Sequence, residues 1–370
     1  MKAHQNTTAK KTKGFSLVEI MVAMVIGLLG TIVIFQVFAV SEKQKRTTVS
    51  GGDAQQNGAI ALFSIEQDAR MGGYGLNYAA LIGCPIRWYR QGPPESGTEA
   101  GDPPLTLTPI VITQGVAAGA ADTITVTYGN SDIAGFAGRL TQEMPNPAAV
   151  YKVNNRFGYN VGDLVVASEV GKDCTLAEVT GLPGGGSSDN VIHNSGGTAV
   201  YNRPAGLGIS YTTSAVLINL GPTPTVNVYS ILDNRLAMQR LLQDDAPVPI
   251  VDGIVQLQAR YGRDTTLVAD GVIDVWDSVS PTTADGWSRV LGVRIAVVAR
   301  SGQRDNAVDA TGVCTTTTAL PQWVSNPLAP AAVNQVENID VSIGNPNWRC
   351  YRYKTFQTSV PIRNMIWRPL

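Results

Sequence analysis

The feature that most constrains this chain is an apolar run near its N-terminus, from Ile20 to Val40. Only Thr31 and Gln36 are clearly polar within it. At about 1.5 Å per residue the run makes a helix of roughly 30 Å, the thickness of a bilayer core. Apolar side chains fall on every side of such a helix, so no face is left for water. The run therefore predicts a membrane span. The alternatives are a fully buried helix and a cleaved secretory signal that ends at residues 37–39.

One carboxylate, Glu19, stands directly before this run, although an ionised side chain is costly at bilayer depth. The segment KKTKGFSLVE (10–19) resembles the class III signal that prepilin peptidase cuts in type IV pilins and in type II secretion pseudopilins. In those proteins a short basic leader is removed after the glycine, and the new N-terminal residue is N-methylated. The resemblance therefore implies a cut between Gly14 and Phe15, N-methylation of Phe15 and loss of residues 1–14.

The same resemblance implies a role for Glu19 in assembly. Cleavage would leave a cationic amine on Phe15, one helical turn from Glu19, and N-methylation keeps that amine cationic. A buried carboxylate is tolerable beside a cation, and in a filament the amine of a neighbouring subunit can serve. We therefore expect Glu19 to fix the register in which the subunit docks. A plain membrane anchor would leave this carboxylate unexplained.

The charges that flank the span orient it only weakly. Four lysines precede it, and Lys43, Lys45 and Arg46 follow it. The signal resemblance implies instead that the N-terminus is cytoplasmic and that the bulk of the chain lies outside. We therefore expect a single-pass inner-membrane protein with a periplasmic head before assembly, and a pilus component at the cell surface afterwards.

A second helical segment follows the span. Gly51-Gly52 should fray or kink the helix, and Gly72-Gly73 should stop it. We expect a helix over residues 15–72, membrane-spanning over about 17–40, and a β-rich head over residues 73–370. An apolar stripe should pack the second half of the helix against the head; its members are Ala59, Ile60, Leu62, Phe63 and Met71.

Strand patterns dominate the chain beyond Gly75. Alternating or continuous apolar residues, rich in β-branched side chains, predict strands at 122–129, 162–169, 215–220, 254–262, 290–300 and 351–364. Residues 234–242 are expected to form a short helix. The fold class is therefore α+β, a type IV pilin-like fold in which a long N-terminal helix packs on a large head rich in antiparallel β-sheet.

Fragments along the whole chain resemble the PilW family of minor pilins. They occur in the family's order from residue 14 to 364, and the clearest are SIEQDARMGGYG, ADTITVTYG, VGDLVVASEVGKDCTLAEVT, VDGIVQLQARYGRD, VLGVRIAVVARS and YKTFQTSVPIRN. The resemblance implies a type IV pilus subunit that works with the major pilin and other minor pilins in an initiating or tip complex. A minor pseudopilin of type II secretion shares the signal and is the alternative. A bitopic envelope receptor or hydrolase is the alternative of another class.

All four cysteines, Cys84, Cys174, Cys314 and Cys350, lie beyond the span. An even number in an oxidising compartment suggests two disulfides, although four cysteines permit three pairings and buried free thiols are the alternative. No C-x-x-C pair is present, which argues against a zinc ribbon or a redox motif. We favour the pairs 84–174 and 314–350, because each closes a loop within one half of the chain.

Little in the sequence points to catalysis. His4 leaves with the leader, so His193 stands alone in a Gly/Asn/Ser-rich loop, where we expect it to be solvated. There is no P-loop, G-x-S-x-G motif or zinc-binding histidine spacing. No basic patch follows the leader, so the sequence lacks the clustered positive charge that nucleic-acid-binding proteins carry. We therefore expect no enzymatic activity and no cofactor.

One acidic cluster, Asp264, Asp270, Asp274 and Asp277, deserves a test against calcium. The stretch from Asp270 to Asp274 resembles the back half of a calcium-binding loop. The front half fails, because the corresponding ligand positions hold Val268 and Thr266, and valine has no side-chain oxygen. An acidic hairpin turn is the favoured interpretation, and a calcium site is the alternative.

Overall fold

The computed structural model describes residues 14–366 apart from short gaps. The residues left out within that range are 77, 93–94, 99–100, 103, 118, 133–136, 188, 244–245, 306–307 and 331–334. Residues 1–13 of the expected leader therefore lie outside the described part. The chain divides into two compact units, Met1–Gly52 and Asp53–Leu370, and we call the second one the head unit.

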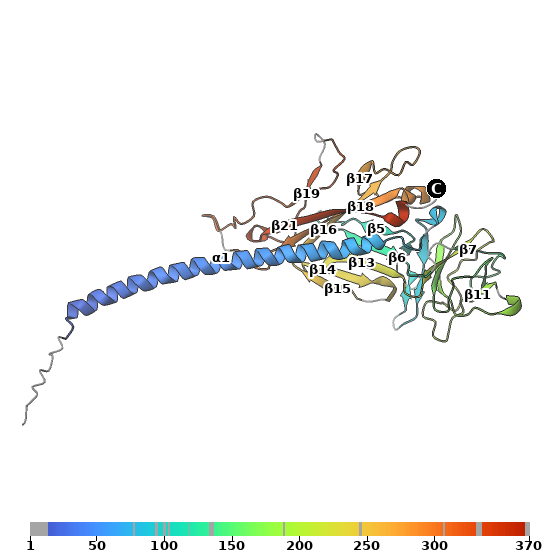
Figure 1. Cartoon of the computed structure of the whole chain (residues 1–370), viewed down its shortest axis with the longest axis horizontal. Coiled ribbons are helices and arrows are strands. Elements are labelled where there is room, and N and C mark those ends of the chain that lie inside the picture. Colours follow the sequence, from blue (N-terminus) through green and yellow to red (C-terminus); the bar gives the residue numbers. More distant parts are fainter. Residues whose placement is uncertain are drawn as a thin grey trace, which may run out of the picture. The chain divides into compact units, whose positions relative to one another are not determined.

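A single helix, α1 (Leu17–Met71), occupies 55 residues and belongs to both units (Figure 1). It continues through Gly51 and Gly52, so the expected fraying does not occur. A glycine costs only about 1 kcal/mol relative to alanine, too little to interrupt a helix that continues into Ala54, Gln55 and Gln56 and packs on the head from Ala54 onward. The expected stop is confirmed: α1 ends just before Gly72, and Gly73 adopts a positive φ of 82°.

The head unit contains three main sheets. A five-stranded sheet has the order β15-β14-β13-β6-β5 and a four-stranded sheet has the order β17-β16-β18-β21. Their strands are β5 (Ile110–Thr113), β6 (Thr123–Tyr128), β13 (Thr225–Leu232), β14 (Arg235–Arg240), β15 (Val248–Asp252), β16 (Ile254–Arg263), β17 (Val275–Asp277), β18 (Val290–Arg300) and β21 (Tyr353–Pro361). Every pairing within these two sheets is antiparallel.

The third sheet has six strands in the order β4-β1-β10-β9-β12-β7. These are β1 (Pro85–Arg87), β4 (Leu105–Thr106), β7 (Ala137–Arg139), β9 (Leu164–Ser168), β10 (Cys174–Glu178) and β12 (Val216–Gly221). One pair, β1 with β10, is parallel. Smaller elements complete the unit: β2 (Tyr89–Arg90), β3 (Ser96–Gly97), β8 (Tyr151–Lys152), β11 (Asn190–Val191), β19 (Gln322–Val324), β20 (Val336–Asn338), α2 (Ala284–Ser288), α3 (Arg363–Ile366) and the 3-10 turns η1 (Ala79–Leu81), η3 (Gly185–Ser187), η4 (Leu241–Gln243) and η5 (Trp348–Cys350).

The six strands expected from the sequence are all present, as β6, β9, β12, β16, β18 and β21. The helix expected over 234–242 is wrong, because most of it is strand β14. Asp233 and Asn234 both have positive φ, 50° and 59°, and connect β13 to β14 with Leu232 opposite Arg235. Two left-handed residues in a two-residue loop are the signature of a type I′ hairpin turn, which Asp and Asn tolerate well.

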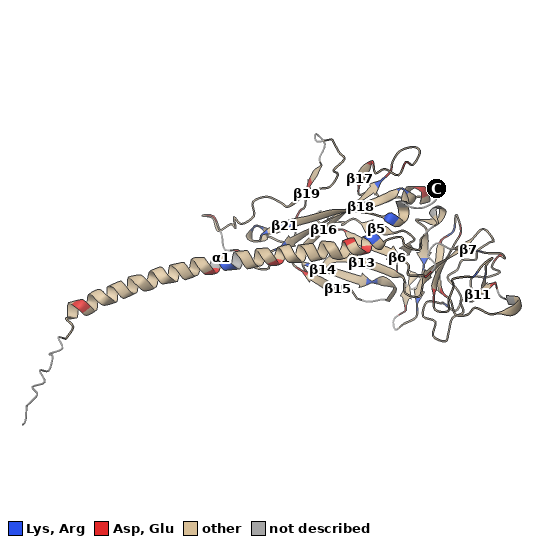
Figure 2. Ribbon diagram, viewed as in Figure 1, with Lys and Arg blue, Asp and Glu red and all other residues tan. Residues whose placement is uncertain are grey.

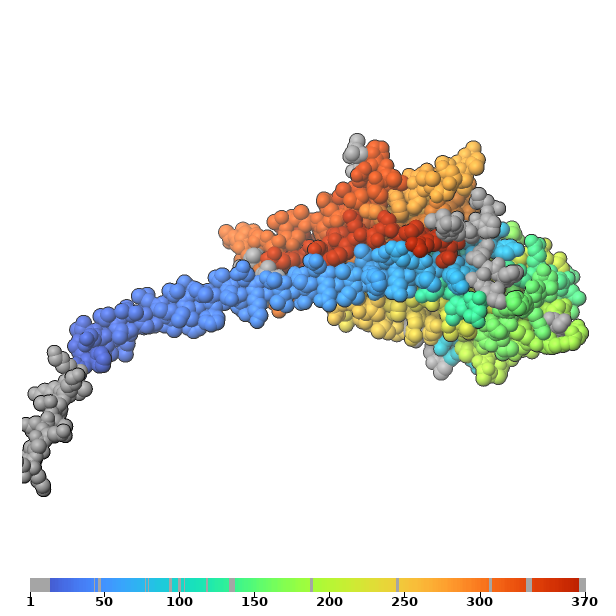
Figure 3. Space-filling model, viewed as in Figure 1, coloured from blue at the N-terminus to red at the C-terminus, as the bar shows by residue number. Residues whose placement is uncertain are grey.

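The second half of α1 packs on the head through three alanines and one isoleucine. Ala54, Ala61, Ile65 and Ala69 are buried in one core with residues of the five- and four-stranded sheets. Figure 3 shows the light blue helix lying between the red C-terminal strand and the yellow strands of the five-stranded sheet. Small residues let the helix axis approach a sheet closely. This contact therefore selects the alanine face of α1.

The expected apolar stripe is consequently wrong for most of its members. Ile60 and Phe63 are 45% and 64% exposed, Ala59 and Met71 are also exposed, and only Leu62 packs partly against the core. The helix therefore also exposes large apolar side chains on its other side, interspersed with Gln56, Gln67 and Arg70, and no described part of the chain covers them.

Asp68 fixes the position of α1 on the five-stranded sheet. Its carboxylate accepts hydrogen bonds from the Tyr229 hydroxyl at 2.7 Å, the Asn227 amide at 2.6 Å and the Tyr128 hydroxyl at 3.1 Å. Burial, together with the hydrogen bond to Asp68, raises the pKa of Tyr229. A charge-assisted cluster of this kind specifies one axial position of the helix, because a shift by one turn would leave the carboxylate without its donors.

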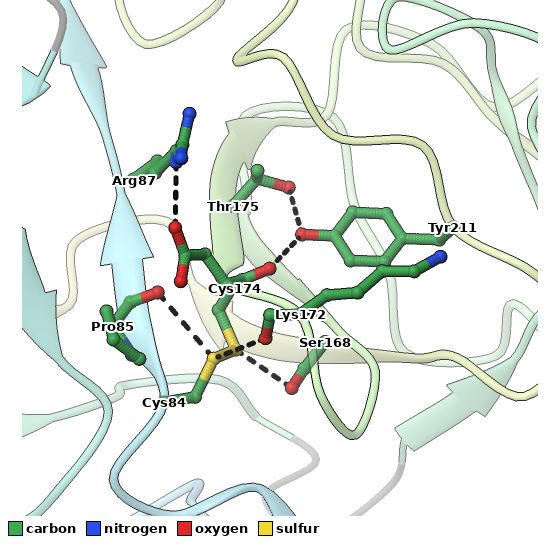
Figure 4. The surroundings of a disulfide bond; sticks show 9 residues. Cys84, Pro85, Arg87, Ser168, Lys172, Cys174, Thr175 and Tyr211 are labelled. Atoms are coloured by element: carbon green, nitrogen blue, oxygen red, sulfur yellow. Dashed lines mark hydrogen bonds and ion pairs between the residues drawn. A yellow bond between two sulfur atoms is a disulfide. The ribbon is translucent and has the colours of Figure 1, made fainter.

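Two disulfides join parts of the head unit. Cys84 is bonded to Cys174, which places the start of β1 beside the start of β10 (Figure 4). Nearby, Arg87 donates to the Asp173 carboxylate at 3.0 Å, and the Tyr211 hydroxyl donates to the Asp173 carbonyl at 2.9 Å. These contacts hold the two strands in their parallel pairing.

The second disulfide joins Cys314 to Cys350, and no free cysteine remains. It connects the long segment after β18 to the 3-10 turn that precedes β21. These are the same two pairs that the sequence favoured.

Candidate processing and assembly site

The start of α1 is organised by a reciprocal pair of hydrogen bonds. The Ser16 amide donates to Glu19 Oε2 at 3.0 Å, and the Glu19 amide donates to Ser16 Oγ at 3.2 Å. This is a capping box, in which two side chains satisfy amides that the first helical turn leaves unpaired. Glu19 therefore has a local structural role that the sequence reasoning missed. The S-x-x-E spacing of SLVE was the signal that could have revealed it.

The capping box leaves Gly14, Phe15 and Ser16 outside the helix. The expected scissile bond, between Gly14 and Phe15, is therefore not held by helical hydrogen bonds. Glu19 lies one helical turn after Phe15. Its carboxylate accepts a hydrogen bond from the amide of Ser16, the residue that follows Phe15. Among the described residues, no basic side chain pairs with Glu19, and only its Oε2 atom accepts a hydrogen bond.

The apolar part of α1 is uncovered. From Leu17 to Glu42 the helix is long and apolar enough to cross a membrane, judged by length and composition, and none of it is buried by the rest of the chain. Figure 2 shows this stretch as uncharged between the acidic residue at its start and the charged residues at its end. Large side chains such as Phe35 and Phe38 are about 70% exposed, a state that water does not favour. The segment requires lipid or other apolar helices around it.

Comparison with protein families gives two matches. Residues 9–35 match the prokaryotic N-terminal methylation motif, and residues 226–364 match the family described as type IV pilus-assembly protein W. Over these two segments the chain is similar to PilW-type pilins. No curated protein and no solved structure matches it.

The two matched segments have different structural roles. The methylation motif covers the capping box and most of the apolar helix, to residue 35 of the span Leu17–Glu42. The PilW segment begins in β13 and ends in α3, so it includes the four-stranded sheet and three strands of the five-stranded sheet. Both sheets contribute to the core against which the second half of α1 packs. The six-stranded sheet comes before this segment in the chain.

The acidic cluster, Asp264 above all, is held by hydrogen-bond donors. Asp264 is buried and accepts from the amides of Asp270 and Gly271, both at 2.9 Å. Burial raises its pKa, but hydrogen bonds from Thr266, Gly271 and Asp270 outweigh that effect and leave the pKa below its usual value. Among the described residues, no group of three or more potential ligands is arranged to hold a metal ion.

The other members of the cluster are equally engaged. Asp274 accepts from the Thr265 amide at 2.6 Å, and Asp277 forms an ion pair with Arg263. The arrangement is that of an acidic hairpin loop whose carboxylates hold its backbone, and it supports the hairpin interpretation over a calcium site.

His193 is not solvated, contrary to expectation. It is buried, its ring stacks on Tyr151 with centroids 4.2 Å apart, and its Nε2 lies 2.8 Å from the Ala149 carbonyl oxygen. Burial lowers its pKa. The surrounding Gly/Asn/Ser composition suggested an exposed loop, but the stacking partner comes from a strand 42 residues earlier and has no local sequence signal.

Proposed function

We propose that this chain is a PilW-type minor pilin, a structural subunit that helps to start or cap the type IV pilus rather than an enzyme. Prepilin peptidase removes residues 1–14, and Phe15 becomes the N-methylated first residue. Before assembly the subunit lies in the inner membrane, with its N-terminus cytoplasmic and residues 73–370 periplasmic. It then joins the major pilin and other minor pilins in the pilus.

The uncovered length of α1 carries this proposal. A plain membrane anchor needs apolar side chains only over the bilayer thickness. Here the helix also exposes large apolar side chains on its outward side in the head unit, at Ile60, Phe63 and Met71, among polar residues. Such a face is expected for a helix that packs against neighbouring helices in a filament, and a solitary anchored receptor has no use for it.

The geometry at Glu19 supports a docking role for this residue. Its Oε2 atom is occupied by the Ser16 amide, while Oε1 accepts no hydrogen bond from the described residues. One carboxylate can therefore cap its own helix and also receive a cation from outside. In the proposed filament that cation is the N-terminal amine of an adjacent subunit, and removal of one partner of such a pair commonly costs about 3–5 kcal/mol.

The first prediction concerns two substitutions at this position. Glu19→Ala removes both the helix cap and the charge, whereas Glu19→Gln keeps an oxygen for the Ser16 amide and removes only the charge. Both variants should be processed and remain in the membrane, and both should be depleted from sheared pili. The measurement is an immunoblot of membrane and sheared fractions beside a count of pili per cell.

The glutamine variant separates the two roles of Glu19. If Glu19→Gln enters pili at the wild-type level while Glu19→Ala does not, the carboxylate acts as a helix cap and its pairing with an amine is refuted. If both variants enter at the wild-type level, Glu19 has no part in assembly.

A further inference from the structure

The loop that joins β16 to β17, residues 264–274, exposes three aliphatic side chains, and we call it the Leu267 loop. Leu267, Val268 and Val272 are 97%, 79% and 56% exposed. The light orange part of the chain that contains this loop projects from the head unit in Figure 3. Isolated exposed aliphatic residues are common on protein surfaces, but three on one short loop are a patch that needs an explanation.

The backbone of the Leu267 loop is held from within. Asp264 receives the amides of Asp270 and Gly271, and Asp274 receives the amide of Thr265. From outside the loop, Arg289 donates to the Thr266 carbonyl oxygen at 2.6 Å. The loop cannot turn its apolar tip inward without breaking these bonds, several of which involve a charged group.

One aliphatic residue of the loop does point inward. The Ile273 side chain lies so close to Gly262 and Gly292 that a Cβ on either glycine would come within 3.2 Å of its Cδ1 atom. The apolar residues of the loop therefore have two roles. Ile273 packs against the four-stranded sheet, and Leu267 and Val268 are exposed at the tip. A rigid loop with an apolar tip loses little conformational entropy when it binds, which is a property of good recognition elements.

The charge around the tip indicates what it can bind. The segment 263–289 contains five aspartates and two arginines, a net charge of −3. Asp277 and Asp285 are ion-paired with Arg263 and Arg289, and Asp264 is buried, so the exposed charges at the tip are those of Asp270 and Asp274. A surface of this sign is repelled by anionic lipids, and a symmetric contact with a second copy would place two acidic loops against each other.

We propose that the Leu267 loop is a docking element for a different protein, one that offers an apolar pocket bordered by lysine or arginine residues. Leu267 and Val268 enter the pocket, and the exposed carboxylates of Asp270 and Asp274 face its basic border. This interaction is independent of the processing site and of Glu19.

The test uses photo-crosslinking of the full-length protein in its own cell envelope. A benzophenone amino acid is placed at position 267, and as a control at position 170, where Val170 is 75% exposed on another loop. Position 267 should give a discrete adduct with a second protein, and position 170 should not. Mapping of the crosslinked peptide should find apolar residues together with a lysine or arginine.

A variant with one negative charge removed tests the proposed contact with basic residues around the partner's pocket. Asp270→Asn keeps the oxygen that caps the Val272 amide but removes one negative charge. The adduct from position 267 should fall by about twofold or more, and its yield should become less sensitive to salt. Non-reducing electrophoresis, which reports the two disulfides, shows whether the variant head has folded.

Four outcomes would overturn the proposal. They are the absence of an adduct above the level at position 170, an adduct with a second copy of this chain, an adduct with lipid alone, and a protein adduct that has no basic residue at its site or is unaffected by Asp270→Asn.

Discussion

His193 shows how burial turns an ordinary side chain into a pH-dependent contribution to stability. Its pKa in the folded head unit lies below the usual value of 6.5, because burial disfavours the charged imidazolium. As the pH falls below 6.5, His193 becomes protonated in the unfolded chain but stays neutral in the folded chain. The stabilising contribution is therefore fully present above the unfolded pKa, and it is lost as the pH falls toward the folded pKa.

We predict that stability decreases as the pH falls below about 6.5, with a contribution from His193 of up to about 1.4 kcal/mol per pH unit. His193→Gln keeps a donor for the Ala149 carbonyl but cannot titrate. Its denaturant midpoint, followed by tryptophan fluorescence of the full chain in detergent micelles, should vary less with pH than that of the wild type. An identical pH dependence in both proteins would contradict the prediction.

At the scale of elements, the contact between α1 and the head depends on a glycine, Gly58, at a point of close approach. A Cβ at Gly58 would lie only 2.1 Å from the ring of Phe356, which belongs to strand β21. A Cβ at Gly52 would meet nothing within 4 Å. The two helical glycines thus offer a matched comparison, since both gain helix propensity on substitution by alanine but only one has a neighbour.

Gly52→Ala should raise the stability by up to about 1 kcal/mol, because alanine is the better helix former. Gly58→Ala should lower it by about 1–3 kcal/mol, because the Phe356 ring must move. Denaturant unfolding of both variants in micelles gives the comparison. Phe356→Leu in the Gly58→Ala background should recover part of the loss; equal effects of the two alanines would show that the close packing at Gly58 is unimportant.

The elements also show which features a single sequence reveals. The apolar run, the glycine stop of α1 and six strands follow from local periodicity and composition. The face of α1 that packs on the head does not, because hydrophobicity ranks Ile60 and Phe63 above Ala61 and Ala69. Contact geometry reverses that order, since a close helix–sheet approach selects small residues. The Asp233-Asn234 turn carried a local signal, but helix-forming residues in the following segment obscured it.

At the scale of the whole molecule, the proposed maturation makes the Gly14–Phe15 bond the boundary between leader and subunit. We predict that mass spectrometry of the protein from its native membrane finds an N-methylated Phe15 as the first residue. Gly14→Val should block cleavage, because the peptidase needs a small side chain before the cut, whereas Thr12→Ala should be processed normally. A first residue at Val40, or an intact Met1, would refute the proposed maturation.

The candidate site was predictable only where its signal is local in sequence. Gly14, Phe15 and Glu19 stand within one short motif, and the capping box with Ser16 lies inside the same stretch. The burial of His193 depends on partners from distant parts of the chain. The donors that saturate Asp264 lie only a few residues away, but they reach it through a loop conformation that composition does not specify.

The disulfide pattern has a consequence for the order of events during export. The bonds join consecutive cysteines, the first with the second and the third with the fourth, over separations of 90 and 36 residues. In the proposed topology the N-terminal anchor enters the membrane first, and the rest of the chain emerges in sequence. Cys84 therefore meets Cys174 before either of the later cysteines has appeared. An oxidant acting on the emerging chain produces the native pairs directly, and no isomerase is needed to correct them.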